Sequence, residues 1–358
     1  MRRMTLITTC GIAVADLIAS DLPRIADAGE VVFAQGPIEL RMGEHACNVS
    51  IDLLQLGLAG SKISTIISLG DDVFGDFIEK VLKRARIDSH VCKARAQTSK
   101  DLVLVVKGED RRFHVDVGAN LYLEPEHVLS VLREDKPRVF YVGGVGMLGK
   151  FDDKLPKVCQ EAKRLGAIVF VDVVPPYGRG WEFIIPSLKW IDILHCNAVE
   201  AFHMTGRKDP REAARALSAL GVKVGLVTMG KDGLVAKIGK TEVSIPPFEV
   251  RVKDPTGAGD AFSSGILFQI AQEPNCASIG KKEDVLGLDI RKWSQILMYG
   301  SACGAACCKG VGTTTSVKPE NIRPLIEKEG EQILKQALES MVTTDTAGDK
   351  HDVKRRKT

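Results

Sequence analysis

The chain has 358 residues, of which 44% are hydrophobic, and it carries a formal net charge of +3 at pH 7. These values are typical of a globular protein with one large core or two modest ones. The longest apolar runs fall well short of the ~18 residues that a membrane span needs, and nothing at the N-terminus resembles a signal peptide. Nine cysteines without a CxxC pair indicate buried thiols in a reducing compartment and no zinc site. We therefore expect a cytoplasmic protein without a membrane partner.

Strand-like and helix-like stretches alternate along most of the chain. This alternation predicts an α/β protein in which a largely parallel sheet has helices on both faces. Strands are expected near residues 4–14, 61–68, 138–143, 167–173, 191–195, 222–229 and 233–238. Helices are expected near residues 46–58, 73–86, 125–134, 152–165, 198–205, 209–220, 258–272, 291–308 and 319–341.

Two stretches, residues 17–42 and 91–117, break this alternation with short alternating strands such as DLVLVVKG and RRFHVDV. We expect them to form a small sheet inserted in a domain that spans residues 1–342. Residues 272–290 are polar, which predicts a surface loop. Residues 343–358 lack apolar anchors and end in a basic run, so we expect a disordered tail with a solvated terminus and no nucleic-acid partner.

Residues 250–266, VRVKDPTGAGDAFSSGI, contain the pattern that points most directly to chemistry. A strand-like run is followed by glycines and then by an apolar helix, with Thr256 as its predicted N-cap. Gly257 and Gly259 would let the backbone approach a ligand. The amides of residues 258–261 would lie in an unpaired first helical turn, which is an arrangement that binds phosphate.

Asp260 is the unusual member of this run, because its carboxylate would repel an anion held by the surrounding amides. It could simply favour the helix dipole. It could also accept the proton of a hydroxyl group that attacks a phosphoryl group, while the amides bind the developing negative charge. Asp, Pro, Thr and small residues occur together here, between a strand and a helix, and this combination favours the catalytic interpretation.

The run DPTGAGDAF at residues 254–262 resembles the DTxGAGDxF signature of the ribokinase-like (PfkB) carbohydrate kinases. The resemblance implies a ribokinase-like three-layer α/β sandwich, with a central mostly parallel sheet and a small β-sheet lid. It implies ATP-dependent phosphorylation of a hydroxyl of a sugar, nucleoside or related polyol. It also implies that Asp260 is the catalytic base and that Gly257, Ala258 and Gly259 form the anion hole.

Further motifs of this family fall in the first third of the chain, on what would be the acceptor side. CGIAVAD resembles the family's GxxxxD, with Asp16 as a substrate ligand at the carboxyl end of the first strand. GEHACN resembles GGxxxN through Gly43 and Asn48, but Glu44 replaces the second glycine, and its side chain would shrink the pocket or add a polar contact. Asn48 could equally cap the helix that follows, as Asp72 could in SLGDDVFG.

The donor side resembles the family in three places. In HCNAVEAFHMTG, Asn197 and Glu200 have the spacing of an NxxE motif, in which Asn197 would donate to a phosphate and Glu200 would hold Mg²⁺ through water. The alternative is a capping Asn with a first-turn Glu. The loop in GLVTMGKD would place Thr228, Gly230 and Gly233 near ATP. Asp254, together with the backbone of CCKGVGTTT, could form a site for K⁺ or another monovalent cation.

Residues 144–149 imitate the GxGxxG of dinucleotide-binding proteins, and a second strand ends in Asp172. This pattern would make the chain an NAD-dependent dehydrogenase. Against that interpretation, Asp152 is the predicted N-cap of the next helix, so that no glycine amide would lie at a helix N-terminus. A second alternative is a metabolite-binding regulatory protein of the same family, which Glu44 supports. We predict a kinase that uses ATP and Mg²⁺, and the resemblance implies a homodimer through the lid.

Overall fold

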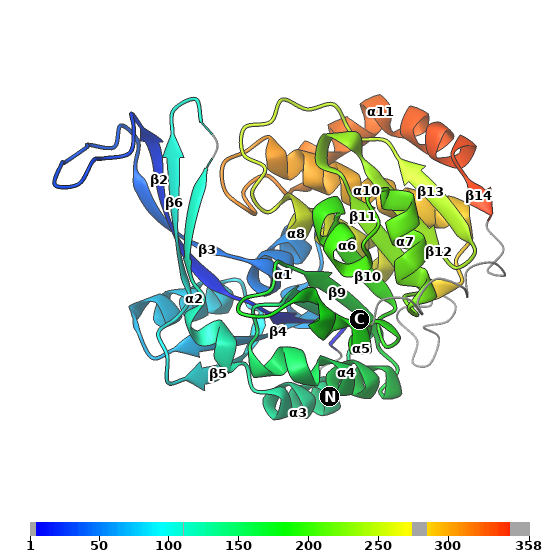
Figure 1. Cartoon of the computed structure of the whole chain (residues 1–358), viewed down its shortest axis with the longest axis horizontal. Coiled ribbons are helices and arrows are strands. Elements are labelled where there is room, and N and C mark those ends of the chain that lie inside the picture. The colour runs from blue at the N-terminus through cyan, green and yellow to red at the C-terminus, as the bar shows by residue number, and fades with distance from the viewer. Residues whose placement is uncertain (1–4, 110, 274–284, 344–358) are drawn as a thin grey trace, which may run out of the picture.

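The computed structural model of the chain describes residues 5–109, 111–273 and 285–343. Its largest feature is a ten-stranded sheet (Figure 1). The strands lie in the order β14 (Val342–Thr343), β13 (Thr241–Ile245), β12 (Leu234–Ile238), β11 (Val224–Thr228), β10 (Ile193–Asn197), β9 (Ile168–Val173), β8 (Val139–Val145), β1 (Ile7–Gly11), β4 (Ile63–Gly70) and β5 (Asp88–Ala94). Neighbours from β5 to β11 are parallel, and β12, β13 and β14 extend the sheet as antiparallel strands.

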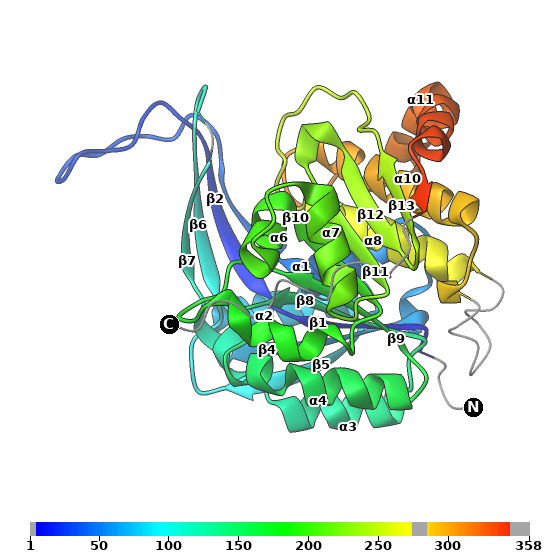
Figure 2. The same ribbon diagram turned by 45° about the vertical axis from the view of Figure 1, so that its right-hand side comes forward.

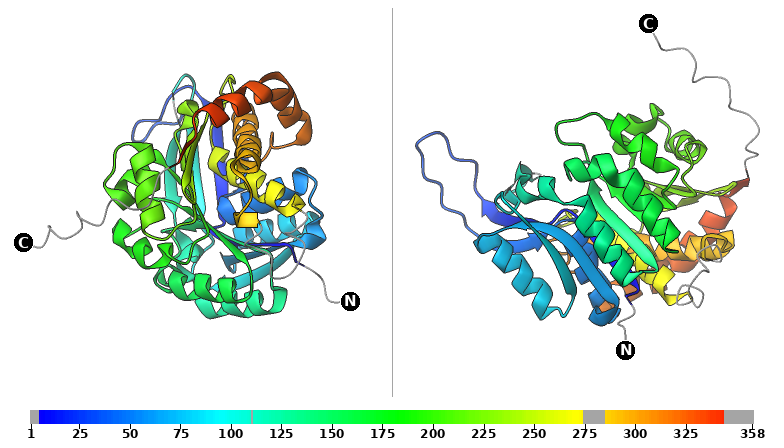
Figure 3. Two further views of the ribbon diagram at one scale, coloured as in Figure 1. Left: turned by 90° about the vertical axis from the view of Figure 1, so that its right-hand side faces the viewer. Right: turned by 90° about the horizontal axis from the view of Figure 1, so that it is seen from below.

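Helices cover both faces of this sheet, as the end-on view in Figure 3 shows. The alternation of side chains along β8 explains the two layers, because Val139 and Tyr141 belong to one core while Phe140 and Val142 belong to the other. The first core packs against α1 (His45–Gln55), α2 (Val73–Arg84), α8 (Ala258–Gln272), α10 (Ile290–Cys308) and α11 (Pro319–Glu339). The second packs against α3 (Pro125–Asp135), α4 (Lys150–Arg164), α5 (Ile185–Leu188), α6 (Ala198–Thr205) and α7 (Pro210–Ala219).

A smaller sheet stands apart at one end of the molecule (Figures 1 and 2). Its strands lie in the order β3 (Ile38–Gly43), β2 (Val14–Leu22), β6 (Lys100–Val106) and β7 (Arg112–Asp116). This confirms the predicted lid sheet, but its limits differ from the expected ones. β2 begins at Val14, because the chain enters the lid directly after β1. Residues 91–94 pair with β4 and therefore belong to the edge strand β5 of the main sheet.

The predicted helices and strands of the main layers all have counterparts, and two further strands complete the sheet edge. β13 and β14 have no counterpart among the predicted strands. Thr343, the first residue of the predicted tail, pairs with Thr241 in β14 and is therefore part of the sheet. Residues 344–358 of that tail and 274–284 of the predicted loop lie outside the described residues. Across the described ranges, no helix combines the length and apolar character that crossing a membrane requires.

Candidate active site

The glycine-rich turn of the signature leads into α8. The helix begins at Ala258, and its N-cap is Gly257, which has a φ of 77°. A Cβ atom on Gly257 would come within 2.8 Å of Thr313, so the backbone conformation and the close packing both require glycine here. Thr256 is therefore not the N-cap that we expected. Its hydroxyl group instead donates to the Asp254 carboxylate at 2.6 Å.

The first turn of α8 leaves two amides open. The Ala258 amide donates to a carbonyl within the turn at 3.2 Å, and the Ala261 amide donates to the Gly257 carbonyl at 2.8 Å. The amides of Gly259 and Asp260 have no acceptor within the described part of the chain. The predicted run of four open amides is thus reduced to its middle pair, which lies at the positive end of the helix dipole and can hold an anion.

Asp260 is only 4% exposed, and it contacts α1 on the far side of the site. Its Oδ2 accepts a hydrogen bond from Asn48 Nδ2 at 2.8 Å, and Asn48 Oδ1 accepts one from Thr313 Oγ1 at 2.9 Å. Asn48 lies inside α1, whose N-cap is Glu44, so Asn48 does not cap the helix. The fold thus brings together two predicted site residues that are 212 positions apart.

His45 forms an ion pair with Asp260, although sequence reasoning assigned it no role. Its Nδ1 lies 2.6 Å from Asp260 Oδ1. Both atoms are buried, and the pair is close without the orientation of a regular hydrogen bond. Burial opposes a charge on the ring, but the carboxylate of Asp260, aided by Asp172 and Glu44, outweighs burial and raises the pKa of His45 to about 10. His45 is therefore a cation at neutral pH. Its position three residues before Asn48 is the one feature of the sequence that could have marked it as a site residue.

Asp16 lies within β2 of the lid, and not at the carboxyl end of β1 where it was expected. Its register partner in β6 is Asp101, so two carboxyl groups lie side by side on one face of the small sheet. Asp16 Oδ1 has no hydrogen-bond partner among the described residues. Burial is the main cause that raises the pKa of Asp16 to about 8, and the charges of Glu44, Asp101 and Asp260 add to it. Such a buried, unpartnered carboxyl group suits a ligand rich in hydroxyl groups.

The run GEHACN connects the lid to α1. A Cβ atom on Gly43 would lie 2.0 Å from Asp16 Oδ2, so glycine at this position makes room for the carboxyl group. Glu44 has a φ of 72° and a ψ of 160°, a conformation that costs a residue with a side chain about 1–3 kcal/mol. Its side chain is 34% exposed, and its Oε2 lies 3.8 Å from His45 Nε2. Partial burial is the main cause that raises the pKa of Glu44 to about 7.

A buried polar network lies beneath the first turns of α8. His195 Nδ1 lies 2.9 Å from Asp172 Oδ2 and 3.1 Å from Ser263 Oγ, and its Nε2 lies 3.2 Å from Thr228 Oγ1. Burial opposes both charges, but the attraction between the pair lowers the pKa of Asp172 and raises the pKa of His195. The network connects β9 and β10 to α8 through Ser263, and sequence reasoning missed this role for both residues.

Asn197 and Glu200 form a capping box at the start of α6. Asn197 Oδ1 accepts hydrogen bonds from the amides of Val199 and Glu200, both at 2.9 Å. Glu200 Oε2 accepts one from the Asn197 amide at 2.8 Å. The capping alternative is therefore present in the structure. The box uses only one oxygen of each side chain. The other two polar atoms, Asn197 Nδ2 and Glu200 Oε1, form no hydrogen bond with a described residue.

The remaining donor-side residues gather at the carboxyl ends of β10 and β11. Thr228 is the register partner of Asn197. Gly230 and Gly233 both have positive φ values in the turn after β11, and a Cβ atom on Gly230 would meet nothing within 4 Å. Glu200 is 7% exposed and lies beside them with one oxygen uncommitted. This suits Mg²⁺, which keeps several of its waters and takes only one or two carboxylates from a protein.

Two arginines connect the lid to Asp254 before α8 and to the loop after α10. Arg111 Nη1 donates to Asp254 Oδ1 at 2.7 Å. Arg41 Nη1 donates to two groups of the loop at residues 311–315, at 3.1 Å each. The other oxygen of Asp254 accepts from an amide of the same loop at 2.9 Å. Asp254, which was predicted to hold a monovalent cation, is thus paired with a guanidinium group in this structure.

The glycine-rich turn at residues 144–149 is closed by its own helix. α4 begins at Lys150 with Gly149 as N-cap, so the prediction of Asp152 as N-cap is wrong. Asp152 instead accepts hydrogen bonds from the amides of Gly146 at 3.1 Å and Leu148 at 3.0 Å. Its carboxylate occupies amides that a dinucleotide would need for its pyrophosphate. The NAD-dependent interpretation therefore has no phosphate site.

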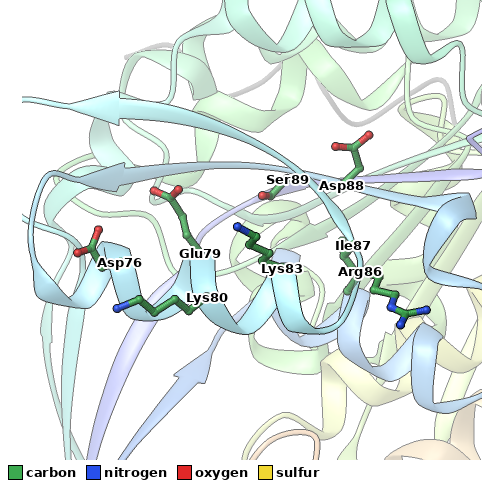
Figure 4. A pocket seen from close by; sticks show the side chains of 8 residues that line it. All are labelled: Asp76, Glu79, Lys80, Lys83, Arg86, Ile87, Asp88 and Ser89. Carbon is green, nitrogen blue, oxygen red and sulfur yellow. The ribbon is translucent and has the colours of Figure 1, made fainter.

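A surface groove between α2 and β5 lies apart from these residues (Figure 4). Acidic and basic side chains alternate along it, as on a solvated face, and it contains no predicted site residue. It is lined by Asp76, Glu79, Lys80, Lys83, Arg86, Ile87, Asp88 and Ser89.

The fold is that of the ribokinases. A ribokinase from Giardia lamblia superposes with a TM-score of 0.77 at 18% identity, over 91% of this chain and 99% of that one. A fructokinase from Xylella fastidiosa, solved with bound ATP, gives 0.75 at 22% identity, over 92% and 100% of the two chains. These likenesses confirm the three-layer α/β architecture with its separate small sheet.

The model of the pfkB family of carbohydrate kinases matches residues 4–321, and the chain belongs to this family. It is similar to a probable fructokinase-2 from Arabidopsis thaliana, with 26% identity over 74% of this chain and 79% of the relative. It is also 26% identical to the aminoimidazole riboside kinase of Salmonella typhimurium, over 77% of this chain and 84% of that enzyme. The chain is thus a carbohydrate kinase, and the dehydrogenase alternative is excluded.

Proposed function

We propose that the protein transfers the γ-phosphoryl group of ATP to a hydroxyl of a sugar, nucleoside or related polyol, with Asp260 as general base. One observation carries the proposal. A buried carboxylate, held by Asn48 and His45, lies in the same helical turn as the two open amides of Gly259 and Asp260. The names of the relatives support the substrate class, since they include fructokinases and a riboside kinase.

In the proposed reaction, the acceptor hydroxyl would lie against the carboxylate of Asp260. Asp260 accepts the hydroxyl proton while the hydroxyl oxygen bonds to the γ-phosphorus. The bond from that phosphorus to the β-phosphate oxygen breaks, and ADP leaves with the electron pair. The Gly259 and Asp260 amides stabilise the charge on the equatorial oxygens. Asn48 and His45 hold the carboxylate in place from α1.

The other predicted site residues divide between the two substrates. Mg²⁺ at Glu200, held through water, would supply positive charge to the nucleotide phosphates when it is bound. Asp16, Gly43 and Asn48 would orient the acceptor. Asn197, Thr228, Gly230 and Gly233 would contact the nucleotide.

We also propose that two copies pair through the outer face of the lid. Leu17 is in register with Leu40 on one side and Leu102 on the other, and this row points away from the face that carries Asp16. Leu40, Leu102 and Ile38 are 39%, 47% and 68% exposed. Exposed apolar side chains gathered on one face are typical of an interaction surface. Analytical ultracentrifugation should give a dimer for the wild type and a monomer for Leu102→Asp, and a wild-type monomer would contradict the pairing.

The decisive experiment measures ATP consumption and phosphorylated product together, over a panel of sugars, nucleosides and inositol with Mg²⁺. We expect one class of polyol to give product in the wild type and none in Asp260→Asn. Product formation that Asp260→Asn leaves intact would remove Asp260 from the mechanism. Binding of polyol without any product would instead support the metabolite-binding protein.

A further inference from the structure

Four carboxyl groups surround the place assigned to the acceptor. Asp16 and Asp101 are neighbours on one face of the lid, Glu44 precedes α1, and Asp260 lies in the first turn of α8. They are close enough for Glu44, Asp101 and Asp260 all to raise the pKa of Asp16. Within the described residues, His45 is the only cation that forms an ion pair with any of the four. The acceptor end of the site therefore gains an excess of negative charge once Glu44, with a pKa of about 7, and Asp16, with a pKa of about 8, are ionised.

Arg41 does not correct this excess, although it is the register partner of Asp16 in β3. Its Nε and Nη2 donate to Glu39, at 2.8 and 2.5 Å, and its Nη1 donates to the loop after α10. Asp101 accepts a hydrogen bond from the amide of His114 at 3.0 Å, and the His114 ring opposes the rise in the pKa of Asp101 that burial causes. Among the described residues, however, neither Arg41 nor His114 forms an ion pair with Asp16 or Asp101.

Glu44 is the member of the four with an unusual backbone. It keeps a glycine-like φ of 72° while it carries an acidic side chain. About one third of that side chain is exposed, and its Oε2 lies 3.8 Å from His45 Nε2, on the ring that pairs with Asp260. A strained backbone that places a carboxylate beside a binding site indicates a function for that side chain.

We propose that Glu44 is a specificity residue that restricts the acceptor to polyols without a phosphate or carboxylate group and favours a polyol that carries an amino group. The inference rests on the proposed kinase function, and it names the acceptor class. An anionic group on the acceptor would meet Glu44, Asp16 and Asp101, while the neighbouring cations His45 and Arg41 are already paired with Asp260 and Glu39. An ammonium group would donate hydrogen bonds to the same carboxyls. ATP is not repelled in this way, because its γ-phosphate lies at the amides of α8.

The test compares matched acceptors in wild type, Glu44→Gln and Glu44→Gly. Glutamine removes the charge and keeps the side chain, whereas glycine also releases the backbone. Glucose, glucosamine, gluconate and glucose 6-phosphate form one series, and ribose with ribose 5-phosphate forms another. Binding is measured by calorimetry and kcat/KM by product formation, both at about pH 9, where Glu44 and Asp16 are ionised because their pKa values are about 7 and about 8. Glu126→Gln on α3 serves as a control, since its side chain is 71% exposed and far from the site.

In the wild type we expect neutral and amino acceptors to be preferred over anionic ones. Both Glu44 variants should reduce that preference by about tenfold to fiftyfold, as the loss of one unit charge beside the acceptor predicts. The control should leave the preference unchanged. A wild type that prefers an anionic acceptor, or a preference unchanged in Glu44→Gln, would overturn the inference.

The inference and the kinase proposal fail separately. If polyols bind with the expected charge preference and yet no product forms with ATP, the acceptor class stands and the kinase proposal falls. If product forms but only Glu44→Gly alters the preference, the kinase stands and the backbone, not the charge, is responsible. If none of the acceptors binds, both are contradicted.

Discussion

Two helices of this protein begin with nearly the same residues, but the aspartate in the first turn of each has different partners. In α4, Gly149 is the N-cap and Asp152 is the third helical residue. In α8, Gly257 is the N-cap and Asp260 is the third helical residue. Asp152 accepts hydrogen bonds from two amides of its own turn. Asp260 is held by Asn48 and His45 instead, and its turn keeps two open amides.

The difference teaches that the local pattern does not decide what a first-turn aspartate does. An aspartate at this position satisfies nearby amides unless something else holds its carboxylate. Residues 45 and 48 of α1 provide that hold for Asp260, from 212 positions away in the case of Asn48. Asp152 has no such partner and closes its own turn. The predictions below test this contrast, from the largest expected effect to the smallest.

Asp260→Asn should lower turnover by roughly three orders of magnitude or more, because an amide cannot accept the hydroxyl proton. Nucleotide binding should persist, since the amides of α8 remain in place. Single-turnover kinetics and calorimetry with ATP measure the two effects. The matched variant Asp152→Asn should keep turnover near the wild-type value. Equal losses of turnover in the two variants would contradict the proposed difference between Asp260 and Asp152.

Asp152→Ala should lower the free energy of unfolding by about 2–3 kcal/mol, because it leaves the buried amides of Gly146 and Leu148 without an acceptor. Urea denaturation measures the change. Asp153→Ala is the control, since Asp153 is 58% exposed and pairs with Arg179 at the surface, where such pairs contribute about 1 kcal/mol or less. A stable Asp152→Ala protein would show that this turn does not need its carboxylate.

His45→Gln should lower kcat by about tenfold to a hundredfold, because it removes the cation that holds Asp260. The pKa of His45 is raised to about 10, so its charge is present below that pH and is lost as pH rises through it. The groups that face it are Asp260, Asp172 and Glu44. Wild-type kcat should therefore decline near pH 10, and His45→Gln should lack that decline. An alkaline limb retained in the variant would assign it to another group.

Asp16 should make acceptor affinity dependent on pH. Its pKa is about 8 in the empty site, which faces Glu44, Asp101, Asp260 and the cation His45. The ionised form accepts hydroxyl hydrogen bonds, so acceptor binding releases a proton. Affinity for a neutral polyol should rise by up to about tenfold per pH unit below pH 8 and level off above it. Calorimetry in buffers of different ionisation enthalpy measures the proton release, and Asp16→Asn should abolish it.

Much of the fold follows from patterns within single segments. The buried strands and amphipathic helices of the main layers are recognisable from their periodicity. Residues 91–94 of β5 are expected in the lid from the sequence, because their side chains suit an edge strand of the main sheet and a strand of the lid equally well. Only their pairing with β4 settles the matter.

The site is less accessible to sequence reasoning on its acceptor side than on its donor side. Asn197 and Glu200 are three residues apart and form a local capping box. The acceptor side depends on contacts between distant segments, such as Asp16 beside Asp101 and His45 beside Asp260. No spacing within one segment encodes these pairs. The roles of His195 and Asp172 were missed for the same reason.

The two arginines of the lid have a consequence for how such an enzyme can be altered. Arg111 is bonded to Asp254, the first residue of the signature, and Arg41 to the loop at residues 311–315. A lid taken from a relative and grafted onto this chain would leave these acceptors without their guanidinium partners. An exchange of the lid must therefore include that loop as well, although more than 190 residues of sequence separate the two segments.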